Sequence, residues 1–271
     1  MTPVRISVVT LSFNQAPFLE AALTSLHDQA YPGLEHIVID PGSSDGSRDI
    51  LARWRPRLAR VILEPDRGPA DGLNKGFAAA TGDVFGYINA DDMALPGSLA
   101  AIARHFGAAD APDMILGRGL LIDREGRARR RLRSSRLNLR DAAFGAMTFV
   151  QQGHYFTRRA FERAGGFNPE NRTSWDWELL IDMARTGATA RNVPEQLGAF
   201  RLYGDTISGS GRMAARMAED LARIRAKALG RGPRPGDRAE QHLRLLARRL
   251  RDPAATLEGL AARLRPSAAA S

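Results

Sequence analysis

The sequence contains no cysteine, which excludes disulfide bonds and thiolate chemistry and permits a reducing compartment. It also lacks a run of about 18 uninterrupted apolar residues, the length that a membrane-spanning helix needs. The first residues enter a strand-like segment directly, and no charged leader followed by a long apolar stretch precedes it. We therefore expect a soluble or peripheral protein.

Positive charge is in excess, but only in one part of the chain. The 271 residues include 39 Lys and Arg against 30 Asp and Glu, a net charge of +9. Residues 212–271 hold 14 of the basic and 6 of the acidic residues, a net of +8, so residues 1–211 are almost balanced. This distribution argues against a catalytic domain built to bind nucleic acid. We expect a domain over 1–211 and a basic amphipathic helical tail over 212–271.

Strands and helices alternate along the first 110 residues. The predicted strands are 4–13, 35–40, 60–64 and 84–89, and helices are predicted from Pro17 to about Tyr31, up to about Arg53, over 68–80 and over 96–106. This order is typical of βαβ units and predicts an α/β fold with a mostly parallel central sheet flanked by helices.

The later segments are less regular. We predict strands at 113–123 and 149–156, a basic hairpin and loop at 124–136, and helices at 158–164 and 175–186. In the tail, Met213, Met217, Leu221, Ile224 and Ala228 recur at helical spacing. A Gly/Pro breaker follows at 230–236, and Asp252-Pro253 would begin a last helix.

Polar clusters follow three of the predicted strands, at 10–14, 40–46 and 89–92. Ligands of parallel α/β sheets bind beyond the carboxyl ends of the strands. We therefore expect these three clusters to form one shared site.

Several segments, in this order and spacing, resemble the family-2 glycosyltransferases. The resemblance covers roughly residues 4–207 and rests on 7–14, 39–47, 64–83, 87–92, 151–152, 164–168 and 175–179. It implies the GT-A fold, with a nucleotide-sugar-binding half at 1–110, an acceptor-binding half at 111–211 and a C-terminal helical extension. It also implies a hexosyltransferase-type enzyme that uses Mg²⁺ or Mn²⁺.

Asn89-Ala-Asp91-Asp92 matches the metal motif of that family, with Asn in place of the first Asp. A hard divalent cation held by carboxylates would neutralise the departing diphosphate. The resemblance implies that Asp92 contacts the metal and that Asp91 contacts the ribose or a metal-bound water. Taken alone, the two aspartates would rather be a solvated acidic turn before the 96–106 helix.

Further donor-binding positions follow from the same resemblance. It places the nucleotide base, typically uracil, at Asp40, and a donor loop around Lys75, which would offset phosphate charge. The alternative for Asn14, favoured equally, is a turn residue and helix cap, and the alternative for Lys75 is a solvated helix residue. The implied nucleotide- and substrate-binding residues are Thr10, Ser12, Asn14, Asp40, Gly42, Asp66, Asp71, Asn74, Lys75, Asn89, Asp91, Gln152 and Arg201.

Asp176 matches the catalytic aspartate of the family, the base that takes the proton from the acceptor hydroxyl. Its neighbours Trp175 and Trp177 would desolvate it and raise its pKa. One base opposite a metal-held leaving group implies a single displacement with inversion. Asp176 could instead cap its helix, and Glu178 is the second candidate for the base.

The acceptor side is less well defined. Gln151, Gln152 and His154 resemble acceptor-side or sugar-binding positions, and Arg201 would contact the diphosphate or pair with an acidic neighbour. Tyr203 stands where many relatives carry a metal-binding His, and Tyr is a poor metal ligand at neutral pH.

The resemblance implies a UDP-sugar donor, a saccharide or lipid-linked acceptor, and a cytoplasmic role in bacterial surface polysaccharide or lipopolysaccharide assembly. The tail would either pack on the domain or bind an anionic membrane on its inner face, and its localised charge favours the membrane. A nucleotidyltransferase would need a Gly-rich basic loop after the first strand, which is absent. A non-catalytic sugar-binding relative and a nucleic-acid-binding protein remain alternatives, although we expect no nucleic acid partner.

Overall fold

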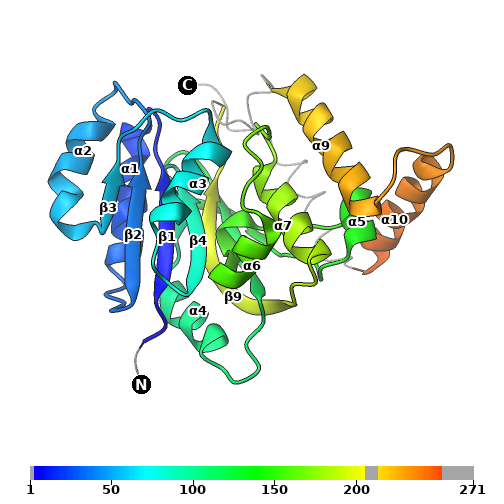
Figure 1. Ribbon diagram of the computed structural model, residues 1–271, viewed down its shortest axis with the longest axis horizontal. Helices are drawn as coiled ribbons and strands as arrows, with labels where there is room; N and C mark the ends of the chain where they lie inside the picture. The colour runs from blue at the N-terminus through cyan, green and yellow to red at the C-terminus, as the bar shows by residue number, and fades with distance from the viewer. Residues whose placement is uncertain (1–2, 205–212, 252–271) are drawn as a thin grey trace.

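The computed structural model describes residues 3–204 and 213–251. Its first half consists of parallel strands joined by helices, as the sequence predicts (Figure 1). The elements are β1 (Ile6–Leu11), α1 (Ala16–His27), β2 (Leu34–Ile39), α2 (Ser47–Trp54), the 3-10 turn η1 (Arg55–Arg57), β3 (Arg60–Ile62), α3 (Pro69–Ala79) and β4 (Val84–Asn89).

The second half extends the same sheet with strands of both directions. Its elements are β5 (Met93–Ala94), α4 (Ser98–Phe106), β6 (Met114–Ile122), β7 (Ala128–Leu132), α5 (Leu139–Ala143), the 3-10 turn η2 (Gln151–Gly153), β8 (His154–Thr157), α6 (Arg158–Ala164), α7 (Trp175–Arg185) and β9 (Ala190–Arg201). The strand order is β3-β2-β1-β4-β8-β6-β9-β5, with β7 paired to β6.

The sheet is mixed, which corrects the prediction of a mostly parallel sheet. Strands β1 to β4 are parallel, but β8 runs antiparallel to both of its neighbours, β4 and β6. The chain returns from β6 to β8 through the β7 hairpin and α5 instead of one helical crossover, and such a return reverses the strand direction.

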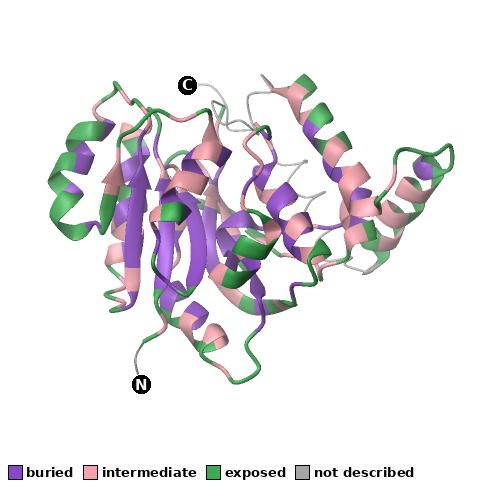
Figure 2. Ribbon diagram, in the orientation of Figure 1, coloured by how far each residue is buried: buried purple, intermediate pink, exposed green. Residues whose placement is uncertain are grey.

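Apolar side chains cover both faces of the sheet. Successive residues of a strand point to opposite faces, so Val8 packs in the cluster that contains Leu26 and Ile102, while Val9 packs in the cluster that contains Phe77 and Phe156. The strands are buried in the middle of the molecule, and the outer turns of α2 and of α10 (Asp237–Arg251) are exposed (Figure 2). The sheet is therefore a rigid support for the loops at its edges.

The longest elements that were not predicted from the sequence are β9 and α10 (Asp237–Arg251), and the short elements β5, α5, η1 and η2 were not predicted either. Strand β9 contains Pro194 and several polar residues, so its pattern is not strand-like. The predicted 149–156 strand begins only at His154 because η2 precedes it. The helix predicted to begin at Asp252 lies outside the described residues.

The described part of the tail consists of α9 (Ala214–Leu229) and α10, which lie at the opposite end of the molecule from β3 (Figure 1). Of the predicted apolar face of α9, Ile224 is buried but Leu221 is exposed. None of the helices in the described ranges has the length and apolar character needed to cross a bilayer.

Candidate active site

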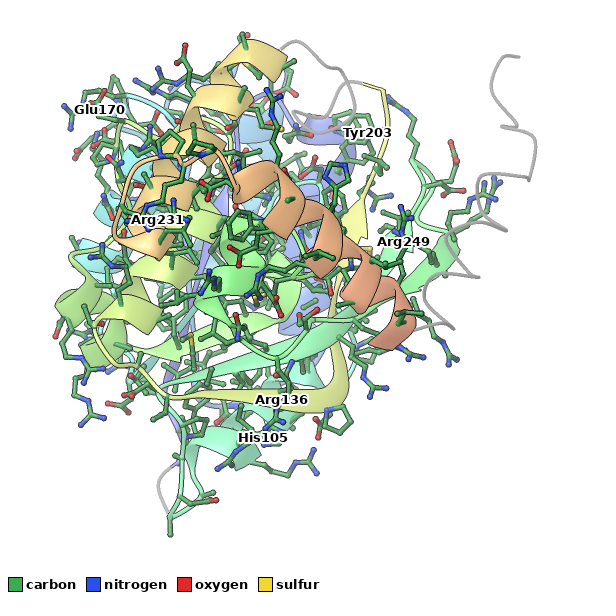
Figure 3. The ribbon with its side chains drawn as sticks, turned by 90° about the vertical axis from the view of Figure 1, so that its right-hand side faces the viewer. His105, Arg136, Glu170, Tyr203, Arg231 and Arg249 are labelled. Atoms are coloured by element: carbon green, nitrogen blue, oxygen red, sulfur yellow. The ribbon has the colours of Figure 1, made fainter. Side chains whose placement is uncertain are left out.

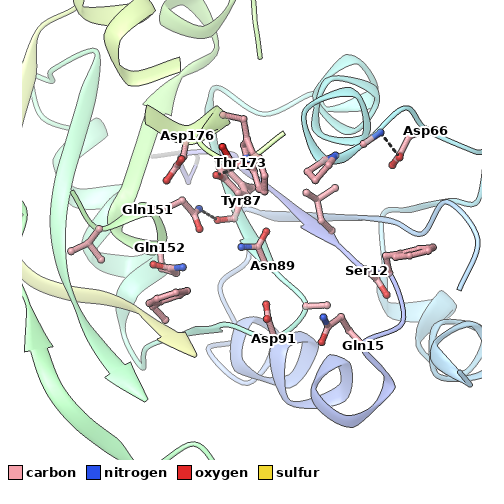
Figure 4. A pocket seen from close by; sticks show the side chains of 18 of the residues that line it. Ser12, Gln15, Asp66, Tyr87, Asn89, Asp91, Gln151, Gln152, Thr173 and Asp176 are labelled. Carbon is pink, nitrogen blue, oxygen red and sulfur yellow. Dashed lines mark hydrogen bonds between the residues drawn. The ribbon is translucent and has the colours of Figure 1, made fainter. Parts of the chain in front are cut away.

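A cavity of about 740 Å³ opens where the four parallel strands β1 to β4 end. Such a volume is typical of small-molecule sites. Its wall is completed by the start of α7 and by the segment before β8 (Figure 4). The lining residues are Leu11, Ser12, Phe13, Gln15, Pro41, Asp66, Gly68, Pro69, Tyr87, Asn89, Ala90, Asp91, Leu132, Phe149, Val150, Gln151, Gln152, Thr173, Trp175, Asp176 and Phe200.

Of the two aspartates after β4, Asp91 lines the cavity and Asp92 does not. Asp92 is 1% exposed, and its carboxylate accepts hydrogen bonds from the backbone N–H of Arg201 at 2.8 Å and from the Gln152 amide at 2.7 Å. Asn89 also donates to Asp92, at 3.2 Å. The sequence assigned the metal contact to Asp92, but the geometry gives Asp92 a structural position and turns Asp91 toward the cavity.

The Asp91 carboxylate is partly buried and accepts a hydrogen bond from the Tyr203 hydroxyl at 3.3 Å. Burial raises the pKa of Asp91, and burial together with the neighbouring Asp91 charge raises that of Asp92 further. A partly buried carboxylate that faces the same cavity as the oxygen-bearing side chains of Ser12 and Asn89 suits a hard divalent cation. Within residues 3–204 and 213–251, however, no three acidic, His or Cys side chains form a complete cation site, so the donor's diphosphate would have to supply further oxygens.

Asp176 lies in the first turn of α7 and lines the same cavity (Figure 4). Burial raises the pKa of its carboxyl group to about 6, although backbone N–H groups at the start of the helix partly offset this. The neighbouring Trp175 anchors the turn, because its indole N–H donates to the Tyr87 hydroxyl at 3.0 Å. A carboxyl group with this pKa is suited to accept a proton near neutral pH.

Glu178, the second candidate for the base, faces away from the cavity. Its buried carboxylate accepts hydrogen bonds from Asn171 at 2.7 Å and forms ion pairs with Arg223 at 3.0 Å and Lys227 at 2.8 Å, both from α9. Despite its burial, the bonds from Arg223, Lys227 and the asparagines lower its pKa to about 2. Glu178 is therefore a poor base and instead joins α7 to α9.

Helix α9 also contacts the loop that precedes Asp176. Asp220 of α9 is fully buried and accepts hydrogen bonds from the Thr173 hydroxyl at 2.8 Å and the Arg172 backbone N–H at 3.1 Å. Thr173 itself lines the cavity. The start of the tail thus supports one wall of the site.

The predicted donor loop is only partly at the cavity. Asp66 lines it, and burial raises the Asp66 pKa. Asp71 accepts from the Arg67 backbone at 3.0 Å and pairs with Lys75 at 3.7 Å, and Lys75 also donates to the Pro65 carbonyl. These two side chains form the local structure of the loop and are absent from the lining.

Asn74 is also occupied elsewhere. Its amide donates to the Phe167 carbonyl at 2.8 Å and accepts from the Phe167 N–H at 2.9 Å. This pair of bonds ties α3 to the segment after α6, so Asn74 holds two elements together.

Of the predicted residues at the carboxyl ends of β1 and β2, only Ser12 lines the cavity. Asp40 is fully buried and accepts from the Ser12 hydroxyl at 3.0 Å and the Gly42 N–H at 3.2 Å. Thr10 bonds to His36 at 2.9 Å, and Asn14 accepts from the Ser44 N–H at 2.9 Å. Thr10, Asn14 and Asp40 therefore stabilise the strand ends and their loops by hydrogen bonds and are absent from the cavity lining.

On the acceptor side, Gln151 and Gln152 line the cavity, whereas His154 and Arg201 do not. The Gln151 amide N–H donates to the Tyr87 carbonyl at 2.8 Å, and its buried Oε1 has no hydrogen-bond partner among the described residues. Burial lowers the His154 pKa to about 3. Arg201 donates to the backbone carbonyls of Asp91 and Asp123, so it fixes the chain around Asp91.

Sequence reasoning missed several residues that the structure brings to the cavity. Phe13 keeps 59% of its surface exposed at the rim, and Gln15, Tyr87, Phe149 and Thr173 also line it. For Tyr87 a signal was available, since residues two apart on a strand share a face and Asn89 was already predicted. Phe149 and Thr173 lie in irregular segments without such a signal.

The fold matches that of several solved structures. S. aureus TarS 1-349 in complex with UDP-GlcNAc matches with a TM-score of 0.69 and 16% identity over 92% of this chain and 73% of that one. The mannosyltransferase PcManGT from Pyrobaculum calidifontis in complex with GDP-Man and Mn²⁺ matches with a TM-score of 0.64 and 24% identity over 100% and 79%. The architecture is thus the GT-A glycosyltransferase fold, as predicted.

The sequence profile of Glycosyl transferase family 2 matches residues 7–221, and the chain belongs to this family. An uncharacterized glycosyltransferase of Nostoc sp. is 26% identical over 74% of this chain, and the match spans 65% of that relative's length. The putative teichuronic acid biosynthesis glycosyltransferase TuaG of Bacillus subtilis is 26% identical over 78% of this chain and 84% of its own length.

Proposed function

We propose that this protein is an inverting glycosyltransferase that moves a sugar from a UDP-sugar to an acceptor hydroxyl in bacterial surface polysaccharide or lipopolysaccharide assembly. One observation carries the proposal: Asp91 and Asp176, from separate elements, line a single cavity at the ends of the parallel strands. Residues 1–110 would bind the donor and residues 111–211 the acceptor. The name of TuaG, a putative teichuronic acid biosynthesis glycosyltransferase, supports a polysaccharide product. The complex of TarS with UDP-GlcNAc supports a UDP-linked donor.

The donor would lie across the ends of β1 to β4. The exposed ring of Phe13 and the neighbouring Pro41 offer apolar surface for the nucleoside, and Asp91 and Asn89 offer oxygen atoms toward the diphosphate. A Mg²⁺ or Mn²⁺ ion held there would neutralise the negative charge that develops on the leaving diphosphate. Tyr203 orients the Asp91 carboxylate by its hydrogen bond.

The acceptor hydroxyl would approach Asp176 from the side of Gln151 and Gln152. Asp176 takes the hydroxyl proton, and the acceptor oxygen bonds to the anomeric carbon. The bond from that carbon to the diphosphate breaks, and the nucleoside diphosphate leaves with the electron pair. Because attack and departure occur on opposite faces, the configuration inverts.

The direct test is a panel of UDP- and GDP-sugars, each with Mn²⁺ or Mg²⁺. We expect a UDP-sugar to raise the thermal midpoint only with the cation present, and to release UDP when an acceptor is added. Stabilisation by GDP-sugars alone would show that the donor nucleotide carries guanine and not uracil. No stabilisation and no release by any donor would contradict it.

A further inference from the structure

Helix α10 is amphipathic, but its apolar side faces away from the protein. Leu243, Leu246 and Leu250 are 67%, 54% and 74% exposed. At about 100° per residue they lie on one side of the helix, within a sector of roughly 60°. A surface helix normally buries such a stripe against its domain. We call these three residues the leucine stripe.

Polar contacts hold the other side of α10 to the protein. Arg140 donates to Glu240 at 2.6 and 2.9 Å, and Arg244 pairs with Asp141 at 2.5 Å. Gln241 donates to the Phe144 carbonyl at 3.5 Å. Charged and amide groups therefore fix the orientation of the helix, and this orientation points the leucine stripe outward.

The surroundings of the leucine stripe are cationic. Arg238 and Arg249 are exposed on α10, and Arg136 is exposed on the same side of the molecule (Figure 3). The acidic residues of the helix are compensated within the protein, since Asp237 pairs with Arg231 at 2.7 Å and Glu240 with Arg140. The outward face of α10 thus combines an apolar stripe with a positive rim.

We infer that this face of α10 lies in the surface of an anionic lipid bilayer, with the helix parallel to the membrane plane. Helices of this composition insert their apolar side at the boundary of headgroups and acyl chains, while arginines contact lipid phosphates. A second copy is a poorer occupant, because pairing two such faces would bring two cationic rims together. The inference specifies the membrane partner of the proposed function, which would hold a lipid-linked acceptor near the enzyme.

The test is flotation of the full chain with vesicles of phosphatidylcholine, alone or mixed with an equal amount of phosphatidylglycerol. We expect flotation only with the anionic vesicles. The triple variant Leu243→Gln/Leu246→Gln/Leu250→Gln should reduce vesicle partitioning by about tenfold or more, because burial of each leucine contributes. The variant Leu63→Gln/Leu221→Gln removes two exposed leucines from other elements and should float like the natural protein.

Two results would overturn the inference. One is equal flotation of the triple variant and the natural protein, and the other is equal flotation on neutral and anionic vesicles. If neither protein floats and only the natural one is dimeric by light scattering, the stripe joins two copies instead. Leu250→Gln alone must give a smaller loss in the same direction, which guards against misfolding of the triple variant. The assay needs no donor or acceptor, so its failure leaves the proposed chemistry untouched.

Discussion

The cavity and the contact between α7 and α9 each contain a carboxyl group that is partly or fully removed from bulk water, but the two groups have different hydrogen-bond partners. Asp176 and Glu178 are two residues apart on α7. Asp176 faces the cavity, and burial raises its pKa to about 6. Glu178 faces α9, where hydrogen bonds from Arg223 and Lys227 lower its pKa to about 2.

This difference separates a reactive carboxylate from a structural one. A carboxylate saturated with cationic donors contributes to stability but has no affinity left for a proton. One that is buried without cationic partners destabilises the fold and keeps its affinity for protons and cations. Asp91 and Asp92 differ in another way, because Asp91 faces the cavity while three uncharged donors hold Asp92 inside. Burial and the neighbouring Asp91 charge raise the pKa of Asp92 to about 8.

The largest effect is expected at Asp176. Asp176→Asn should lower the transfer rate by about 10²- to 10⁴-fold, because the amide cannot accept the acceptor proton. The donor affinity should remain, as measured by calorimetry with UDP-sugar and Mn²⁺. Normal turnover of this variant would show that Asp176 is not the base.

The next effect concerns stability. Glu178→Ala should lower the free energy of unfolding by about 3 kcal/mol, since it leaves the cationic groups of Arg223 and Lys227 without their buried partner. Urea denaturation measures this change. Asp176→Ala is the control and should not destabilise, because the carboxyl group there is partly desolvated and has no cationic partner among the contacts of the described residues. Equal losses of unfolding free energy in the two variants would contradict the distinction between a structural carboxylate at Glu178 and a reactive one at Asp176.

A third prediction separates the two aspartates after β4. Asp91→Asn should weaken Mn²⁺-dependent donor binding about tenfold or more, with little change in the thermal midpoint. Asp92→Asn should chiefly lower the thermal midpoint, because Asn89 and Gln152 then donate toward an amide. The opposite pattern would restore Asp92 as the metal-facing residue.

The smallest effect is a dependence on pH. Transfer should fall about tenfold per pH unit below 6, as Asp176 becomes protonated. The Asp176 pKa is raised on folding, so this group adds stability as pH falls from 6 toward 4. Glu178 has a lowered pKa, and its contribution is complete above about 4.5 and lost only toward 2. A rate profile flat between pH 5 and 7 would contradict the assignment.

The parallel half of the fold could be predicted because its signals are local. The strands β1 to β4 are buried segments that end in Gly/Ser or acidic loops, and their predicted and observed limits agree within a few residues. The direction of β8 could not be predicted, because it depends on pairing with β4 and β6, which lie far away in the sequence. Helix α10 was not predicted because its leucines are exposed and its charged residues face the protein, the reverse of the usual arrangement of a surface helix.

The site was predicted as a region more securely than as individual side chains. Asp91, Asp176, Ser12, Asp66, Asn89 and Gln152 do line one cavity. That Asp91 lines the cavity and Asp92 does not depends on Gln152 and Arg201, which are 60 and 109 residues from Asp92. Likewise, the helical turn that carries Asn74 directs it toward Phe167, a contact 93 residues away that no local pattern indicates.

The anomalous scattering of Mn²⁺ in crystals grown with UDP tests the central claim most directly. The account predicts one strong peak within coordination distance of the Asp91 carboxylate, inside the cavity that Asp176 also lines. A peak coordinated by Asp92, or one outside this cavity, would contradict it.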